Sequence, residues 1–429
     1  MRVNSAFGEC DSWYRASSVR PELRWPTLAS NARVDVAIVG GGFAGLWSGL
    51  LLAQSGLTVT LLEGGRVAGK ASGRNGGFVS GGWLIRAERL CALMGEERGG
   101  HLYRLSLEGR NRVRRFLADK PDIVQGEGKL KVLRHADGGK LHEWGAMMNR
   151  RFGTRFEPWS LSRVQSHLKS KRYRDGLQDP DGFHVQPIDL AHALAETAEA
   201  AGARVCENSP VSRVGREAAG WCVETAGGSV SADRVVLATN VQSELISPIL
   251  GRAILPVATY VVAGVLGEAA LDEAITYRGA IADTRRAGDY YRRIGDRLIW
   301  GGRMTTQRAI PARLAEEMSG DIAGVYPQLG RMAFSHCWTG LMGYTRHQMP
   351  VVAELARGLF ACTGFGGHGL NTCPAGAHAV AQAILGDRTE LDLFSEFGPV
   401  WAGGPAGRAA TQAEYWRRQM IDWWQERAA

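Results

Sequence analysis

The chain has 429 residues, which is too long for one ordinary core and favours two domains. Hydrophobic residues make up 45% and charged residues 22%, as in globular proteins, and no uninterrupted apolar run of ~18 residues predicts a membrane span. The formal net charge of +8 is scattered without a run of five or more Lys and Arg, so we expect a solvated basic surface and no nucleic-acid partner.

Cysteine usage and the first residues predict a cytoplasmic protein. The seven cysteines are odd in number and form no C-x-x-C motif, which argues against a disulfide framework and a metal site and for a reducing compartment. The opening residues, MRVNSAFGEC, carry no apolar segment of the kind found in signal peptides.

A strand, a glycine-rich turn and a helix follow one another near the N-terminus. Residues 34–39 (VDVAIV) form an apolar run rich in β-branched residues, and residues 44–55 show a helical apolar pattern. Between them, Gly40, Gly42 and Gly45 match G-x-G-x-x-G. The first glycine permits a tight turn, the second lets the main chain approach a pyrophosphate, and the third lets the helix pack closely on the strand.

The unit closes with a second strand and an acidic residue. Residues 57–62 (LTVTLL) are apolar, and Glu63 follows them, 23 residues after Gly40. A carboxylate there can accept hydrogen bonds from ribose hydroxyls, while the free N–H groups of the helix start favour phosphates. The unit predicts a dinucleotide site, with FAD and NAD both possible, and its further contacts are Phe43, Ala44 and Gly64.

Residues 69–77 (GKASGRNGG) follow this unit, and with them the chain resembles the D-amino-acid-oxidase-like superfamily of FAD-dependent oxidoreductases. The similarity is greatest to the branch of gamma-glutamylputrescine oxidase-like and glycine–sarcosine oxidase-like enzymes. The resemblance implies that this segment runs along the flavin ring and ribityl chain. The contacts that it implies are Ser72, Arg74, Asn75, Gly76 and Gly77.

Further matches extend the resemblance over nearly the whole chain. They are the lead-in at 13–28, a helix over 189–201, the strand segment 233–240 (DRVVLATN), and a hairpin with a Gly-Asp turn over 289–303. The resemblance implies an adenine contact through Val211 and further cofactor contacts at Ala238 and Thr239.

Residues 358–374 (GLFACTGFGGHGLNTCP) predict a strand over 359–362, a glycine-rich turn and a helix that starts at Leu370. The resemblance places this helix start at the flavin pyrimidine, where its dipole and free N–H groups would stabilise the anionic reduced flavin. His368 is a weak catalytic candidate, which we interpret first as a structural residue of the loop. The contacts implied here are Gly340, Gly366, Gly367, His368, Gly369 and Leu370.

The stretch 338–352 (WTGLMGYTRHQMPVV) resembles the strand and turn on the substrate side of the flavin. Met342 stands where sarcosine oxidase-like relatives carry a flavinylated cysteine, and about where amino-acid-oxidising relatives often carry a carboxylate-binding arginine. The resemblance therefore implies non-covalent FAD and disfavours an α-amino acid held by such an arginine. Weak substrate contacts are Tyr291, Arg303, Met342, Tyr344 and Arg346, and Tyr290 and Trp300 are further aromatic residues of the same region.

The resemblance implies oxidation of a C–N bond in a primary or secondary amine, such as a polyamine derivative or an N-substituted amino acid. A hydride would pass to flavin N5, and the imine would then hydrolyse in water. Some relatives use a lysine near the flavin to promote reaction with O2, and Lys70 is the weak candidate here, so O2 and another redox acceptor both stay open. The alternatives are a 2-hydroxy-acid or polyol-phosphate dehydrogenase and a flavoprotein subunit without turnover.

We predict an α/β fold, α+β overall, with two domains. A Rossmann-like FAD-binding domain of the glutathione-reductase type covers 30–90, 155–245 and 340–395, and a mixed-sheet substrate domain covers 91–154 and 246–339. Residues 400–429 form a C-terminal helical tail. One face of this tail carries Trp416, Met420, Trp423 and Trp424. We expect that face to pack on the chain's own domain, with a homodimer contact and then a membrane surface as alternatives, so the chain is a monomer or a homodimer.

Overall fold

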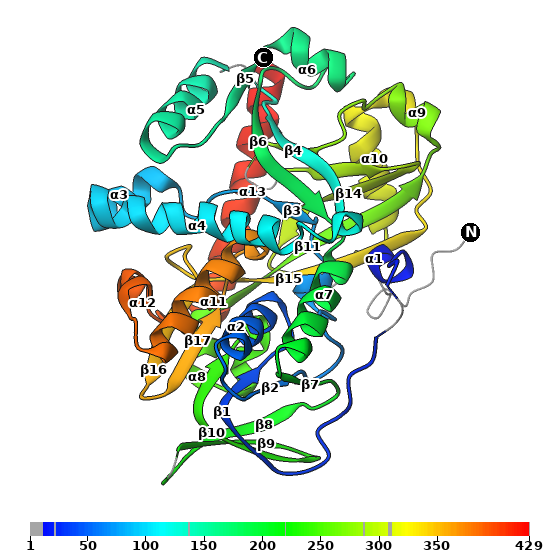
Figure 1. Ribbon diagram of the computed structural model, residues 1–429. Coiled ribbons are helices and arrows are strands. Elements are labelled where there is room, and N and C mark those ends of the chain that lie inside the picture. Colours follow the sequence, from blue (N-terminus) through cyan, green and yellow to red (C-terminus); the bar gives the residue numbers. More distant parts are fainter. Residues whose placement is uncertain are drawn as a thin grey trace.

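The computed structural model describes residues 12–20, 23–135, 138–218, 220–285, 288–307 and 311–428. These residues fold around two β-sheets, one in the lower and one in the upper half of Figure 1, with helices packed around them. The predicted fold class is confirmed, because a largely parallel sheet and a mixed sheet are both present.

The first sheet has a parallel centre in the order β17-β10-β1-β2-β7, with β16, β8 and β9 added by antiparallel pairs. Strands β2 and β17 are apolar and almost entirely buried, as expected where both faces of a sheet are covered. Its strands are β1 (Ala32–Val39), β2 (Val59–Leu62), β7 (Arg204–Cys206), β8 (Val211–Glu217), β9 (Gly220–Thr225), β10 (Gly228–Leu237), β16 (Val351–Ala356) and β17 (Leu359–Thr363).

The second sheet runs in the order β15-β11-β14-β13-β12-β4-β6-β3, with β5 paired to β6. Most neighbouring strands of this second sheet are antiparallel, and among its described strands only β12 and β4 pair in parallel. Its strands are β3 (Phe78–Val79), β4 (Val124–Val132), β5 (Glu157–Trp159), β6 (Gly176–Val185), β11 (Leu255–Val265), β12 (Ala280–Asp283), β13 (Tyr290–Ile294), β14 (Arg297–Thr305) and β15 (His336–Tyr344).

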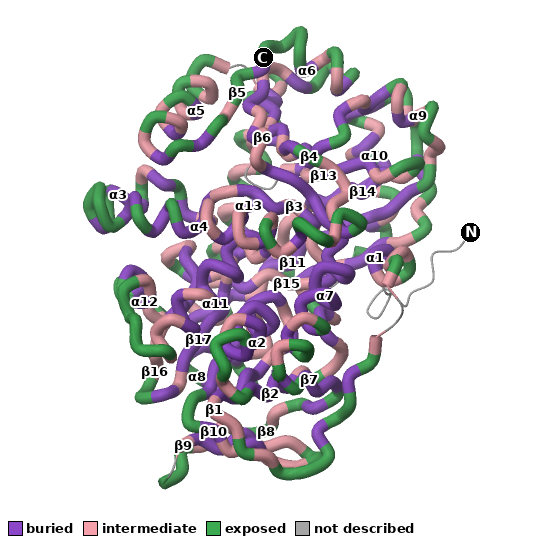
Figure 2. Tube along the Cα trace, in the orientation of Figure 1, coloured by how far each residue is buried: buried purple, intermediate pink, exposed green. Residues whose placement is uncertain are grey.

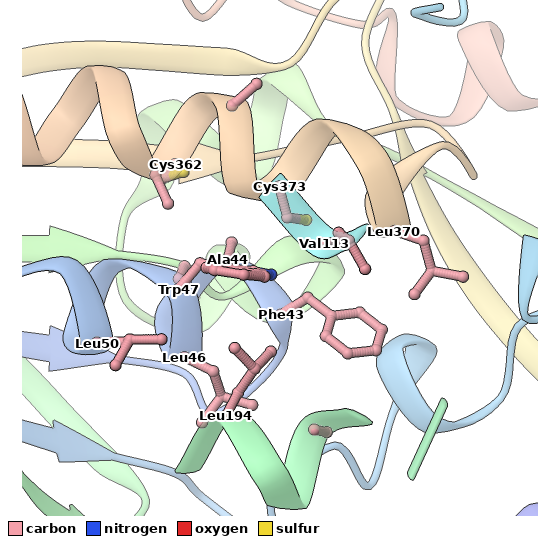
Figure 3. Close-up of a cluster of buried hydrophobic side chains, with 14 of the residues drawn as sticks. Phe43, Ala44, Leu46, Trp47, Leu50, Val113, Leu194, Cys362, Leu370 and Cys373 are labelled. Carbon is pink, nitrogen blue, oxygen red and sulfur yellow. The ribbon is translucent and has the colours of Figure 1, made fainter. Parts of the chain in front are cut away.

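Three helices pack on the first sheet and on one another: α2 (Phe43–Gln54), α7 (Pro187–Ala200) and α11 (Gly369–Leu385). Helix α7 begins after Gln186, whose side chain accepts hydrogen bonds from the N–H groups of Ile188 and Asp189. Figure 3 shows apolar side chains of α2, α7 and α11 meeting in one cluster, with Phe43 and Leu370 at the same end of their helices. Two helix N-termini therefore meet at one place beside the sheet.

The remaining helices cover the second sheet and the edges of the molecule. Figure 2 shows green, exposed tube at α6 and α12 and mostly purple, buried tube along α2 and α11. No helix among the described residues is both long and apolar enough to cross a membrane. These helices are α1 (Trp13–Ala16), α3 (Ala87–Met94), α4 (Glu96–Phe116), α5 (Gly138–Phe152), α6 (Leu161–His167), α8 (Pro248–Ala253), α9 (Glu268–Asp272), α10 (Leu314–Val325), α12 (Thr389–Leu393) and α13 (Gly404–Ala428).

The sheets divide the chain differently from the predicted boundaries in three places. Strands β5 and β6 belong to the second sheet, although the prediction grouped residues 155–245 with the FAD-binding segments. The short strand β3 and the end of β15 also lie in the second sheet. Pairing between strands distant in sequence decides this membership, and local periodicity does not report it.

Candidate flavin and substrate site

The glycine-rich turn after β1 fits a ligand that approaches the main chain closely. Gly40 has a φ of +111°, and a Cβ there would lie 2.6 Å from the carbonyl oxygen of Ala238. A Cβ on Gly45 would collide with the carbonyl oxygen of Gly40, and one on Gly42 would lie 2.9 Å from Ser72 Oγ. Gly40 and Gly45 therefore exclude a side chain, whereas at Gly42 only the Ser72 hydroxyl would have to shift.

Glu63 lies directly after β2 and faces this turn. Its Oε2 accepts the N–H of Gly41 at 2.7 Å, and its Oε1 accepts the N–H of Gly65 at 2.9 Å. Burial raises the pKa of this carboxyl group, while the two N–H groups act in the opposite direction. Gly64 follows and packs on Pro210, next to Val211 at the start of β8.

A cavity of about 190 Å³ opens beside Glu63. Its size and its position at the carboxyl ends of parallel strands fit one part of a dinucleotide. Lys70 lines this cavity together with Glu63 and lowers the pKa of that carboxyl group. Lys70 therefore lines the cavity beside Glu63, together with Gly73 and Arg74 of the segment assigned to the flavin, and its role near the flavin stays a prediction. The other lining residues are Ser12, Arg15, Gly65, Arg66, Ala68, Gly69 and Ile188.

The ASGRNGG segment forms a turn that crosses between the two sheets. Ser72 Oγ accepts the N–H of Phe43 at 3.0 Å, so this hydroxyl caps the start of α2. Asn75 Nδ2 donates to the carbonyl oxygen of Ser72 at 2.6 Å, and Asn75 Oδ1 accepts the N–H of Gly77 at 2.8 Å. The asparagine side chain thus holds the turn itself, which differs from the expected use of small polar side chains on ribityl hydroxyls.

The two glycines of this segment lie against the second sheet. A Cβ on Gly76 would be 2.9 Å from the ring of Tyr290, and one on Gly77 would be 2.6 Å from Arg292 Nη2. Arg74 and Gly340 also meet, because a Cβ on Gly340 would lie 3.4 Å from the carbonyl oxygen of Arg74. These contacts join residues that the sequence predicted as cofactor contacts from distant segments.

Arg292 is a buried cation that sequence reasoning missed. Its side chain is fully buried, and Nη1 donates to Val185 O and meets His184 Nδ1, each at 2.8 Å. Nε and Nη2 have no hydrogen-bond partner among the described residues, and no described carboxylate pairs with this guanidinium. An anionic group next to Gly77 would compensate this charge, which fits an anionic reduced flavin there.

The GFGGHG loop connects β17 to α11. Gly366 and Gly367 have φ values of +57° and +83°, and a Cβ on Gly367 would lie 2.7 Å from Met342 Sδ. His368 is the N-cap residue of α11, and its Nδ1 lies 3.3 Å from the carbonyl oxygen of Gly366. Burial, with smaller effects of Lys129 and Lys131, lowers the pKa of His368 to about 4. The ring is therefore neutral at pH 7, and its interpretation as a structural residue of the loop stays a prediction.

The second sheet turns one face toward these loops. Tyr290 lies on that face, with its hydroxyl 3.1 Å from Thr259 Oγ1 and its ring edge-on to Phe78. Met342 and Tyr344 of β15 pack against a buried cluster of Leu255, Val257 and Tyr415. Tyr415 comes from the C-terminal helix α13, which sequence reasoning did not connect with the site.

Two of the predicted substrate contacts have other partners in the structure. Tyr291 points to the opposite face of β13, where its ring stacks on Trp300 at 4.1 Å and its hydroxyl lies 2.6 Å from that of Tyr326. Arg303 donates to Glu317 at 2.5 Å and to Asp321 at 2.6 Å, so its guanidinium is already neutralised. Trp300 is likewise a core residue, and Arg346 is exposed in the turn after β15.

Two lysines on β4 are the second feature that sequence reasoning missed. Lys131 pairs in register with Ala282, and Ala282 pairs with Tyr290, so Lys131 and Tyr290 share one face of the sheet. Lys129 Nζ lies 2.9 Å from Ser80 Oγ, and neither lysine forms an ion pair within the described chain. Burial lowers the pKa of Lys131 to about 8 and also lowers that of Lys129. The alternation in GKLKV, with Leu130 and Val132 in the core, was the available signal.

The fold and these loops define a flavin-dependent oxidoreductase with a two-sheet architecture. The model of the family "FAD dependent oxidoreductase" matches residues 35–383. The chain belongs to this family and is an FAD-dependent oxidoreductase. The family resemblance and the FAD cofactor predicted from the sequence are confirmed.

Related proteins cover the same span. The chain is 28% identical over 404 residues to the probable oxidoreductase OrdL of Rhizobium meliloti, covering 93% of this chain and 94% of that protein. It is 28% identical to gamma-glutamylputrescine oxidoreductase of Escherichia coli, covering 90% and 92%. The crystal structure of glycine oxidase from Bacillus cereus has a TM-score of 0.69 at 22% identity, covering 84% and 97%, and supports the fold.

Proposed function

We propose that the protein oxidises a C–N bond of a primary or secondary amine with non-covalently bound FAD. The observation that carries this proposal is the lining of the second sheet, where Met342 and Tyr344 face Gly367 of the GFGGHG loop, Tyr290 faces Gly76, and no carboxylate stands among these three side chains. A neutral amine needs no strong base from the protein, so this lining suits it. Two relatives support an amine, since their names are gamma-glutamylputrescine oxidoreductase and glycine oxidase.

The chemistry divides between cofactor and chain. When bound, FAD supplies the acceptor for the hydride that leaves the carbon next to nitrogen, and the resulting imine hydrolyses in water. The aromatic and thioether side chains of Tyr290, Tyr344 and Met342 hold the alkyl part of the substrate and exclude water. The N-terminus of α11 and the Arg292 guanidinium place positive charge on both sides of the loops and favour an anion between them.

We further propose that the substrate carries an anionic group beside the amine. Lys129 and Lys131 lie on the face of the second sheet that holds Tyr290, and neither ammonium lies within ion-pair distance of a carboxylate in the described chain. Asp179, the register partner of Lys129, attracts both lysines but also pairs with Arg110 at 3.8 Å, so a substrate carboxylate would add compensation for the two cations. A polyamine derivative with an acidic substituent and an N-substituted amino acid both meet this requirement.

A 2-hydroxy acid or polyol phosphate is the second candidate, because the two lysines would hold its anionic group equally well. Oxidation of a hydroxyl group, however, requires a base for its proton, and a base works best with a pKa near the operating pH. His368 has a pKa of about 4 and is a poor base at neutral pH. This difference favours the amine.

An anaerobic absorbance titration tests the proposal. The FAD-loaded protein is mixed with amines with and without a carboxylate, N-alkyl amino acids, D- and L-amino acids and hydroxy acids, while the oxidised flavin band near ~450 nm is followed. Bleaching by amines with an acidic group, with release of ammonia or an amine, is the expected result. Bleaching by hydroxy acids alone would replace the proposal by the second candidate, and bound flavin that no compound reduces would favour a subunit without turnover. Admission of air then separates an oxidase from a dehydrogenase.

Met342 and the cysteines lead to two further expectations, on how FAD is bound and on where the protein is located. Met342 cannot form a thioether link to the flavin, so acid precipitation should release all FAD into the supernatant, and flavin that stays with the pellet would contradict non-covalent binding. The six cysteines of the described residues are buried and form no disulfide, which supports a reducing, cytoplasmic location.

A further inference from the structure

The C-terminal helix α13 turns its most apolar stripe toward solvent. Trp416, Met420, Trp423 and Trp424 are 58%, 57%, 47% and 65% exposed. Their spacing places them on one side of the helix, one above the other. The expectation that this face packs on the chain's own domain is therefore wrong, and a continuous aromatic surface is left uncovered.

The side of α13 that adjoins the stripe contacts the rest of the protein near both ends of the helix. Gln412 Oε1 accepts the N–H of Thr306 and the hydroxyl of Thr305, each at 2.8 Å. Near the other end, Glu426 forms ion pairs with Arg172 at 2.8 Å and with Arg134 at 3.1 Å. Because both ends are held in this way, the helix cannot rotate to bury its tryptophans.

We propose that this stripe is the contact between two copies of the chain, with the two α13 helices packed antiparallel about a two-fold axis at Met420. In such an isologous contact, residue i meets residue j and j meets i. Trp416 stands four residues before Met420 and Trp424 four residues after it, so Trp416 faces the partner subunit's Trp424. Arg417 and Trp423 stand three residues to either side of Met420, so each faces the other across the axis.

The stripe is large enough to form the apolar centre of a dimer contact, about half of the area that each partner contributes. A tryptophan side chain buries about 150–250 Å². With roughly half of each of the three tryptophans and of Met420 accessible, the stripe offers about 400 Å², against about 800 Å² per partner in a standard interface. The polar residues that flank the stripe along 25 residues of helix supply the rim.

The charges on α13 favour a second copy over a membrane surface. Helices that lie on membranes carry a polar face rich in Lys and Arg. Here the polar face is turned into the protein, and the outward Arg417 is paired with Glu414 at 2.7 Å. Arg427 lies 3.7 Å from the centre of the Trp423 ring, so it is also engaged within the helix.

The contact would also support the substrate side of the site. Tyr415, next to the stripe but on the inner side, is 5% exposed and packs with Leu255 and Val257 beside Met342 and Tyr344. A partner on the outer side of α13 would therefore lie one helix diameter, ~10 Å, from this cluster.

Molar mass measured by light scattering on the FAD-loaded protein tests the proposal. We expect twice the chain mass of 46.5 kDa for the wild type. Met420→Glu should weaken the dimer roughly thirtyfold or more, because it buries a charge at the centre of the contact. Gln425→Glu adds the same charge at an exposed position of the same helix off the stripe and should leave the dimer intact. A monomeric wild type at ~100 µM, or a dimer that Met420→Glu leaves unchanged, would overturn the proposal.

A cysteine at the axis tests the antiparallel arrangement directly. Met420→Cys should form a cross-linked dimer under oxidising conditions, because the two copies of this residue meet at the axis, while Gln425→Cys should not. A dimer without this cross-link would overturn the arrangement. A wild type that is monomeric and sediments with phosphatidylcholine–phosphatidylglycerol vesicles would replace the dimer by a membrane surface.

Discussion

The two oxygens of the Glu63 carboxylate accept the N–H groups of Gly41 and Gly65, and each oxygen keeps capacity for a ligand hydroxyl. Glu63→Gln retains the size of the side chain but replaces one acceptor by a donor. We expect FAD to bind about tenfold more weakly, since a charged hydrogen bond contributes about 1.5–3 kcal/mol. Titration of the apoprotein with FAD measures this change, with the exposed Glu273→Gln as control. Unchanged affinity would contradict the role of Glu63 on the ribose.

Arg292 and Arg293 form a matched pair for testing the charge near the flavin. Both are buried, but Arg292 points toward Gly77 without a carboxylate, whereas Arg293 pairs with Asp272. Arg292→Met should lower the two-electron midpoint potential of bound FAD by roughly 30 mV or more, because the reduced flavin loses a compensating cation. Arg293→Met should shift the potential much less. A dye-equilibration titration measures the midpoint potential of both variants. Equal shifts in Arg292→Met and Arg293→Met would show that Arg292 has no specific effect on the flavin charge.

Lys131 gives the anionic-group proposal a pH dependence. Its lowered pKa of about 8 means that the ammonium loses its proton as pH rises through 8, well below the usual range for lysine. We expect KM for a carboxylate-bearing amine to rise above pH 8, and Lys131→Met to raise KM about tenfold at pH 7 with little change in kcat. The exposed Lys171→Met is the control. If KM for the carboxylate-bearing amine changes neither in Lys131→Met nor across pH, Lys131 does not bind the substrate carboxylate.

At the scale of elements, Tyr415 joins α13 to the substrate side. Tyr415→Ala removes a buried aromatic ring from the cluster with Leu255 and Val257, so we expect a loss of about 3 kcal/mol in the free energy of unfolding. KM for the amine should rise as well, because Met342 and Tyr344 lose their support. Denaturant titration and steady-state kinetics measure the two effects, with the exposed Gln419→Ala as control. A destabilised variant with unchanged KM would separate α13 from the site.

The elements that the sequence predicted best are those that local pattern determines. The nucleotide unit from β1 to β2 is correct because apolar runs, glycines and the acid lie within one short segment. Tyr290 and Tyr291 could not be told apart, since adjacent strand residues face opposite sides and both are aromatic. Arg303 looked free because its partners on α10 are 14 and 18 residues away.

The stripe on α13 shows the other limit of local pattern. Helical spacing identified which residues share a face, but not whether the chain or a partner covers that face. The deciding contacts, from Glu426 to Arg134 and Arg172, join segments 292 and 254 residues apart.

At the scale of the whole molecule, the two sheets bury histidines that must stay neutral for the chain to remain folded. Burial lowers the pKa of His368 to about 4 and that of His184 to about 3, from an ordinary value of 6.5. The unfolded chain takes up these protons below pH 6.5 while the folded chain does not, so stability falls as pH decreases from 6.5 toward 4. The shift of His368 alone corresponds to about 3 kcal/mol.

Denaturant titrations from pH 7 to pH 4 should therefore show a steady loss in the free energy of unfolding. His368→Asn should make this pH dependence shallower, because asparagine takes up no proton in either state, whereas the exposed His101→Asn should not. If FAD leaves only where the protein unfolds, flavin release and unfolding will share one pH profile. Release of the flavin at a higher pH than unfolding would instead place the titrating group in the cofactor loops. If the free energy of unfolding of His368→Asn depends on pH as steeply as that of the wild type, this histidine is excluded as the cause of the pH dependence.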